Sequence, residues 1–217
     1  MGAACDCGRG VEAGDGGMKR VFDICLGCLA ALILFVPVLL VAVAVCVTSK
    51  GPALYWSERL GRNNVIFKMP KFRSMQVGTP VVATHLMTDA GSHLTPIGSF
   101  LRKSSLDELP QLWSIFKGDM SFVGPRPALF NQDDLIELRT NAGVHKLVPG
   151  LTGWAQINGR DKMDIIRKVQ LDVEYMNQKS IFLDLKILLM TVKKVLFREG
   201  IAESGQVTMS KFTGNTK

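Results

Sequence analysis

The sequence predicts a mainly α-helical protein with a minor β component, attached to a membrane near its N-terminus. No charged residue occurs from Ile24 to Val47, and the chain from Asp164 to Arg198 has a largely helical composition. One stretch, NNVIFKMPKFRSM, has the alternating and aromatic character of a strand. The length of 217 residues suits one domain with a buried core.

The apolar run from Ile24 to Val47 is long enough, at ~1.5 Å per helical residue, to cross a hydrocarbon layer of ~30 Å. It is too long for a secretory signal, and no A-x-A-like site follows it. Pro37 predicts a kink or break near its middle. Basic residues flank both ends, so neither end is marked for export. A kinked transmembrane helix and a broken, re-entrant helix both fit.

Composition divides the chain into four parts. We expect residues 1–17 to be a disordered extension, 18–50 the membrane segment, 51–201 one folded domain and 202–217 a C-terminal tail. All five cysteines lie in the first two parts. The CxxC spacing of CLGC falls in the apolar run without a histidine or acid nearby, so no metal or redox role is expected there.

The middle of the chain predicts short elements. Pro70 either restricts the strand to an edge or interrupts it. Residues 76–98 have turn residues without periodicity, which predicts a loop. A helix is expected from Asp107 to Phe116 with a stop at Gly118.

The second half predicts an extended GPRP segment, a helix over DDLIELRTNAG and a structured loop over VPGLTGWAQINGR, followed by helical structure to Arg198. The last helical part, IFLDLKILLMTVKKVLF, fits either a helix in the membrane interface or a buried core helix.

Two adjacent acids, Asp107 and Glu108, stand out in a chain of net charge +7. Acids in a first helical turn are favoured by the helix dipole, and Ser105-x-x-Glu108 has capping-box spacing. With Asp107 as the cap, Pro110 lies at the third helical position, where its missing amide costs nothing. Capping then explains Asp107 and leaves Glu108 unexplained.

Cations surround these acids in the sequence. Five lie between Trp56 and Met75, two precede Asp107, and Arg126 stands between two prolines. Such a set fits a solvated face, an anionic lipid contact or a phosphate clamp. Acids, cations and a membrane together indicate phosphoryl chemistry on a lipid-borne group. The sequence has no HxxxH spacing, no P-loop and no GxSxG motif, so no other catalytic template competes with this interpretation. An aromatic content of 7% argues against nucleic acid as a partner.

Three motifs carry a specific resemblance: KFRSM, LRKSSLDELPQLWSIFKGDMSFVGPRP and PGLTGWAQINGR. Together they resemble the bacterial sugar transferases, the monotopic polyprenyl-phosphate phosphoglycosyl transferases, from about Lys19 to the C-terminus. The ending SGQVTMSKFTGN is similar to that of the small single-domain members that use UDP-linked acetamido or diacetamido sugars. The resemblance implies one catalytic domain with interfacial amphipathic helices and a Pro-broken re-entrant helix, on the cytoplasmic face of the bacterial inner membrane.

The same resemblance assigns roles by position. Asp107 would attack the sugar-linked phosphate of a UDP-sugar and expel UMP, and undecaprenyl phosphate would then take the phosphosugar from the aspartate. Glu108, with Asp107, would hold Mg²⁺. The expected substrate-binding residues are Lys68, Lys71, Arg73, Arg102, Arg126, Gln156 and Arg160.

One position departs from the family pattern. The family breaks its membrane helix at a Ser-Pro pair, whereas this chain has Val36-Pro37. Valine offers no hydroxyl to a carbonyl that the break leaves free, although the positive flanks favour the re-entrant form. The identity of the sugar, the pathway and any homo-oligomer are left open, and a membrane-bound scaffold without metal dependence is the rival to an enzyme.

Overall fold

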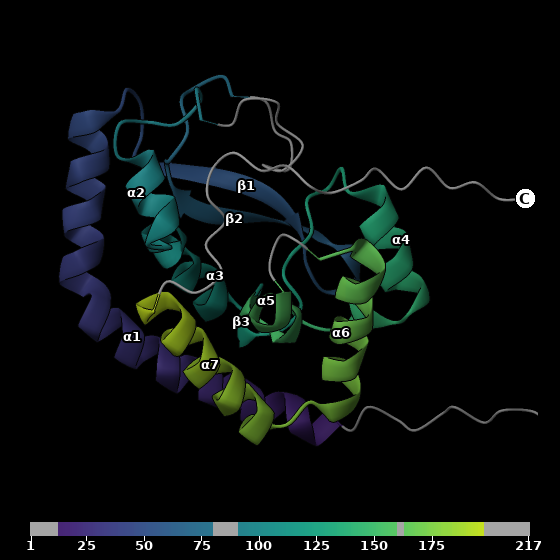
Figure 1. The fold of residues 1–217 in the computed structure, drawn as a ribbon. Coiled ribbons are helices and arrows are strands. Elements are labelled where there is room, and N and C mark those ends of the chain that lie inside the picture. Colours follow the sequence, from purple (N-terminus) through teal and green to yellow (C-terminus); the bar gives the residue numbers. More distant parts are fainter. Residues whose placement is uncertain (1–12, 80–90, 160–162, 198–217) are drawn as a thin grey trace, which may run out of the picture.

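The computed structural model describes residues 13–79, 91–159 and 163–197. Short helices pack around two small sheets, and one long bent helix borders this body on two sides (Figure 1). The mainly helical class with minor β structure is confirmed. The predicted domain boundaries stay predictions.

Helix α1, Ala13–Thr48, contains the whole apolar run and the internal Pro37, and its ribbon changes direction partway along (Figure 1). Within the described residues, it is the helix long and apolar enough to cross a membrane, from Gly16 to Thr48. Helix α1 includes residues 13–17, which were expected to belong to the N-terminal extension. Residues 1–12 lie outside the described residues.

Both ends of α1 are fastened to the folded body. Near the start, Lys19 pairs with Asp184, and the buried Asp23 accepts hydrogen bonds from Ser121 Oγ at 3.0 Å and Phe122 N at 3.2 Å. Near the end, Val45 is fully buried in a cluster with Phe72 and Leu101. The helix therefore returns to the body that it left.

The predicted strand is β2, Ile66–Phe72, and it pairs antiparallel with β1, Leu54–Leu60, across the turn η1, Arg62–Asn64. Strand β1 was not predicted. Since the sheet has two strands, both are edge strands, and Pro70 is tolerated as expected. The described parts of the 76–98 segment include a bridge between Met75 and Leu94, and residues 80–90 lie outside the described residues.

The acids do not lie where a capped α-helix would place them. After α2, Gly98–Lys103, the chain forms a 3₁₀ segment η3, Leu106–Gln111, and α3 begins only at Leu112 and runs to Lys117. The expectation that Asp107 caps an α-helix is therefore wrong, because the turn begins before Asp107: Glu108 N donates to Ser105 O at 3.2 Å. The stop at Gly118, with a φ of +95°, is confirmed.

The expectation of a loop over VPGLTGWAQINGR is also wrong. Strand β4, Gly150–Thr152, pairs parallel with β3, Ser121–Val123, and helix α5, Trp154–Gly159, follows. A Cβ on Gly150 would lie 2.1 Å from the backbone N of Gly124, and a Cβ on Gly153 would lie 2.1 Å from its O. The glycines permit close backbone contact between segments and do not mark a loop.

The remaining helices match their predictions. Helix α4 covers Asp133–Asn141, the short turn η4 covers Val144–Lys146, and α6 and α7 cover Ile165–Gln178 and Ile181–Leu196. The GPRP segment is non-helical, as expected.

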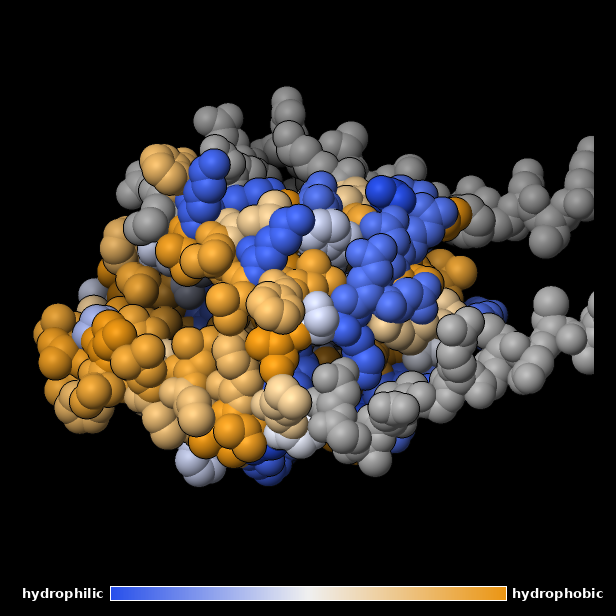
Figure 2. Space-filling view, turned by 90° about the horizontal axis from the view of Figure 1, so that it is seen from below, coloured by the Kyte–Doolittle hydropathy of each residue, from blue (hydrophilic) through white to orange (hydrophobic). Residues whose placement is uncertain are grey.

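Helix α7 is not a fully buried core helix. Ile187 is fully buried on one face, whereas Phe182 is 88% and Leu189 66% exposed on the other. Figure 2 shows a broad hydrophobic surface on the underside of the molecule, where α7 lies beside the first half of α1 in Figure 1. This exposed apolar surface favours the interface prediction for α7 over the core alternative.

Candidate active site

Glu108 joins three segments of the chain at one carboxylate. Its Oε1 lies 2.8 Å from Arg126 Nη2, in the GPRP segment, and 3.6 Å from Lys71 Nζ, on β2. Glu108 itself stands on η3, which packs closely against β2. Three predicted site residues from distant parts of the sequence are therefore in contact.

The electrostatics of this cluster keep Glu108 ionised. Burial alone would raise the pKa of Glu108, but the charges and hydrogen bonds of Arg126 and Lys71 bring it down to about 2. Burial also lowers the pKa of Lys71 to about 8, against the opposing effect of Glu108. At neutral pH the carboxylate is charged and the lysine is mostly protonated.

Asp107 behaves differently from its neighbour. Its side chain is buried, at 9% exposed, and burial together with the negative charge of Glu108 raises its pKa to about 6. The charges of Lys71, Arg102 and Arg126 act in the opposite direction and limit the rise. Asp107 is therefore a poorly solvated carboxylate, ionised near neutral pH and surrounded by cations, which are properties of a nucleophile toward phosphorus.

A buried ion pair fixes the backbone of the GPRP segment. Arg139 on α4 binds Asp172 on α6, with 2.6 Å between Nη2 and Oδ2, and both side chains are almost fully buried. The same guanidinium donates from Nη1 to the backbone O of Arg126 at 2.7 Å. The pair therefore fixes the backbone of the residue whose side chain contacts Glu108.

Other predicted site residues lie apart from this cluster or at its edge. Arg102 donates to Ser74 Oγ at 3.1 Å and acts on Asp107 by charge. Arg73 donates to the backbone O of Lys50 at 3.2 Å, and Gln156 to that of Leu151 at 3.0 Å.

Lys68 lies on the exposed face of the β1–β2 sheet, because side chains alternate along β2 and Lys71 is three residues away. The structure therefore does not bring Lys68 to the Glu108 cluster. Arg160 lies outside the described residues.

Two contributors were not predicted as site residues. Arg59, on β1, acts on Glu108 and Arg126 by charge, and burial lowers its own pKa to about 10. Its place in the basic stretch before Met75 was a visible signal, but the pairing of β1 with β2 was not. Arg139 had no signal, because nothing in the sequence of α4 links it to Arg126.

Two carboxylates could contribute to a metal site. The described residues contain no group of three or more His, Cys, Asp or Glu side chains that could hold a metal. Asp107 and Glu108 are adjacent, and both described cation contacts of Glu108 fall on Oε1. Mg²⁺ is commonly bound through one or two carboxylates and completed by substrate phosphates and water, so the pair fits such an ion.

Comparisons with known proteins agree with this chemistry. The chain is 41% identical over 206 residues to the uncharacterized sugar transferase EpsL of Bacillus subtilis, covering 91% of this chain and 96% of the relative. It is 39% identical over 190 residues to the undecaprenyl-phosphate glucose phosphotransferase of Komagataeibacter xylinus, covering 82% of this chain. It is also 39% identical over 184 residues to the UDP-glucose:undecaprenyl-phosphate glucose-1-phosphate transferase of Escherichia coli, again covering 82%.

The chain spans only 36% and 40% of the length of the last two relatives. The sequence model of the bacterial sugar transferases matches residues 15–198, which include the membrane helix, the acids and the GPRP segment. The protein therefore belongs to the bacterial sugar transferase family and is an enzyme of the transferase class.

Proposed function

We propose that the enzyme transfers a phosphosugar from a UDP-sugar to undecaprenyl phosphate and releases UMP. The observation that carries the proposal is the buried Asp107 beside a Glu108 carboxylate held by Lys71 and Arg126. The relatives named for sugar-phosphate transfer to this lipid support the substrate classes. The product is a polyprenyl diphosphosugar, which would start the assembly of a glycan on the membrane.

The transfer takes place in two displacements on one phosphorus atom. A carboxylate oxygen of Asp107 attacks the phosphorus that carries the sugar, the bond from that phosphorus to the bridging oxygen breaks, and UMP leaves with that oxygen. An oxygen of undecaprenyl phosphate then attacks the phosphosugar-aspartate and restores the Asp107 carboxylate. Arg126, Lys71 and Arg102 offset the negative charge that gathers near Asp107.

Asp107→Asn tests the nucleophile directly. The amide keeps the shape of the side chain but does not attack phosphorus, so UMP release should fall at least ~1,000-fold. UMP release is measured with undecaprenyl phosphate over a panel of UDP-glucose, UDP-galactose and UDP-linked acetamido and diacetamido sugars. Asp133→Asn, in the first turn of α4, is the matched control and should keep full activity. Near-normal turnover by Asp107→Asn would contradict the proposal.

The panel also decides the sugar. The ending SGQVTMSKFTGN led to the expectation of an acetamido or diacetamido sugar, and all of it lies outside the described residues. Two of the relatives described above are named for glucose. We propose the acetamido sugars as the preferred donors, and a clear preference for UDP-glucose or UDP-galactose would exclude them.

We further propose that Glu108 and Asp107 hold Mg²⁺ together with the donor phosphates. When bound, the ion would offset charge on the diphosphate. EDTA should remove at least ~90% of UMP release, added Mg²⁺ should restore it, and Glu108→Gln should raise the Mg²⁺ concentration needed for half-maximal rate about 10-fold. Undiminished turnover in EDTA would show that the carboxylates work without a metal.

The pH dependence of UMP release follows from the ionisation of Asp107. Because its pKa lies at about 6, the protonated and non-nucleophilic form accumulates below that pH, and the rate should fall as pH decreases through it. Arg102 lowers this pKa, so Arg102→Gln should shift the acid limb to higher pH. The control Arg62→Gln, on the turn η1 at the tip of the hairpin, should leave the limb in place. A limb that Arg102→Gln does not move would show that another group titrates.

For the membrane segment we propose a re-entrant helix, with the folded body on the cytoplasmic face of the bacterial inner membrane. Contacts of Lys19 and Asp23 at one end of α1, and of Val45 at the other, fasten both ends to one body. A helix that spans the membrane would place its two ends on opposite sides, and one of them would lose these contacts. Helix α1 contains Pro37 and is bent (Figure 1), and such a bend fits the re-entrant form.

Labelling of single cysteines tests this topology. In a chain whose five cysteines are replaced by serine, Gly16→Cys and Lys50→Cys place one thiol near each end of α1. A membrane-impermeant maleimide should label both from the cytoplasmic side, in inverted vesicles, and neither in intact spheroplasts. Thr140→Cys, on α4, marks the side of the folded body. Labelling of the two ends from opposite sides would establish a spanning helix.

A further inference from the structure

An exposed groove on the β1–β2 sheet has no part in the proposed transfer. We call it the aromatic groove, and its aromatic lining residues are Tyr55, Trp56, Trp113 and Phe130, with Lys68 and Lys117 beside them. The four aromatic side chains are 40%, 47%, 62% and 41% exposed in that order. Large aromatic side chains gathered on an open surface indicate a contact with another phase or molecule.

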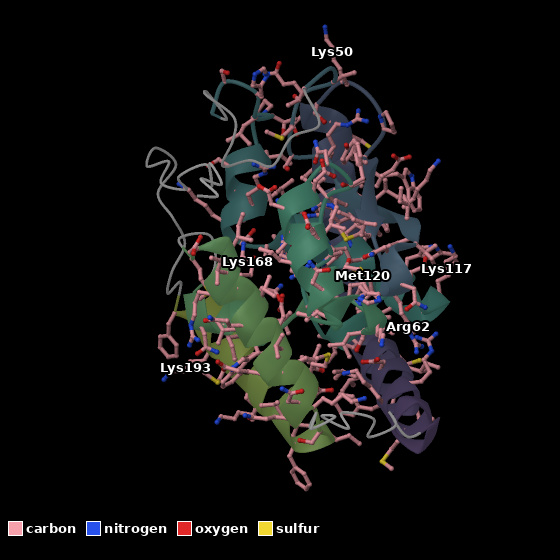
Figure 3. All side chains as sticks on the ribbon, turned by 90° about the vertical axis from the view of Figure 1, so that its right-hand side faces the viewer. Lys50, Arg62, Lys117, Met120, Lys168 and Lys193 are labelled. Carbon is pink, nitrogen blue, oxygen red and sulfur yellow. The ribbon has the colours of Figure 1, made fainter. Side chains whose placement is uncertain are left out.

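The sheet separates Trp56 and Lys68, which line this groove, from the Glu108 cluster. Trp56 and Lys68 lie on its exposed face, whereas Ser57 and Met69 are buried on the opposite face, which Lys71 shares. Figure 3 shows Lys117 on one flank of the molecule, with Lys168 and Lys193 on the other. Tyr55, the cross-strand partner of Lys71, lies on that opposite face and borders both surfaces, whereas Lys68 faces away from Lys71 and Lys117 stands on α3.

The two walls of the groove are attached to the two ends of the membrane helix. One wall is β1, which begins at Leu54, shortly after α1 ends at Thr48. The other wall is α3, and Arg20 near the start of α1 donates to the backbone O of Ile115 at 2.5 Å and of Phe116 at 2.6 Å. In Figure 1, α3 lies inside the angle of the bent α1. Both ends of a re-entrant helix lie at the water–lipid boundary, and so then does the groove.

The composition of the groove fits that boundary. Tryptophan and tyrosine concentrate at head-group depth, where an aromatic ring meets lipid and its polar atom meets water. Lys117 pairs with Asp119 at 3.0 Å, and Lys68 stands opposite Glu58 across the two strands. Exposed pairs of this kind are weak, so a lipid phosphate can replace the carboxylate as the partner of either ammonium group.

We propose that the aromatic groove seats the head group and upper acyl chain of an anionic bilayer phospholipid, such as phosphatidylglycerol. The rings cover the acyl chain, and Lys68 and Lys117 receive the phosphate. The proposal rests on the re-entrant topology of the proposed function and is independent of the transfer chemistry. It fixes the body on the membrane by a third surface, in addition to α1 and α7.

The chain supplies its own probes for the experiment. Two of its three tryptophans, Trp56 and Trp113, lie in the groove, and the third, Trp154, donates to Glu174 at 3.1 Å elsewhere. The Trp154→Phe chain is reconstituted in phosphatidylcholine vesicles that contain phosphatidylglycerol brominated just below the head group. Because bromine quenches at contact, the groove tryptophans should lose about half of their fluorescence. Brominated phosphatidylcholine, with unlabelled phosphatidylglycerol present, should quench them about two-fold less.

Lys117→Gln should abolish that difference between the two brominated lipids, whereas Lys146→Gln, on η4, should preserve it. A chain with all three tryptophans replaced by phenylalanine and with Phe182→Trp reports the surface of α7 in the same vesicles. Fluorescence of the unmodified chain gives a second measurement that needs no substitution.

The outcomes distinguish a failure of the lipid proposal from a failure of the membrane orientation on which it rests. If Phe182→Trp is quenched and the groove tryptophans are not, the groove faces water or a protein partner, and the lipid proposal is overturned. If neither is quenched, the membrane orientation itself has failed, and the proposal fails with it. If both lipids quench the groove equally, the surface contacts lipid without selecting an anionic phosphate, and the head-group assignment is wrong.

Discussion

The contact of Glu108 with Lys71 and Arg126 is the interaction on which the rest of the site depends. Burial lowers the pKa values of Arg59 and Lys71, and repulsion among Arg59, Lys71 and Arg126 lowers them further. The ionised carboxylate of Glu108 offsets this repulsion, so that β1, β2 and the GPRP segment can pack together. The negative charge of one glutamate offsets only part of the charge of these cations, so the net positive charge near Asp107 suits a diphosphate.

A second ion pair gives this arrangement its rigidity. Arg126 is half exposed, and its contact with Glu108 alone would be a weak surface pair. The buried Arg139 binds Asp172 and also donates to the backbone O of Arg126. The backbone of Arg126 is therefore fixed, although its guanidinium is exposed. A buried pair of this kind adds little net stability, since desolvation opposes the attraction. Its use here is to set the position of a residue in the site.

The sequence predicted what depends on local pattern and missed what depends on pairing between distant segments. The apolar helix, α4, α6 and α7 follow from periodicity and end signals. Strand β1 forms by pairing with β2, and its own sequence does not indicate that pairing. Gly150 permits a close contact with Gly124 that no local pattern indicates. Asp107 and Glu108 were predicted because capping left Glu108 unexplained, although the cap itself was wrong, because Asp107 lies inside a 3₁₀ segment that begins at Leu106.

The two-stranded sheet connects the catalytic site and the membrane surface in one element. Successive residues of a strand point to opposite faces, so Lys68 and Lys71, three positions apart, serve different surfaces although both belong to one basic stretch. The β1–β2 hairpin follows α1 directly. The segment η3 packs against β2, and α3 forms one wall of the aromatic groove. Leu106 and Leu109 of η3 pack with Val45 near the end of α1, and in the proposed re-entrant topology this places Asp107 close to the membrane boundary. A water-soluble nucleotide sugar and a lipid-bound phosphate can meet at one aspartate only at that boundary.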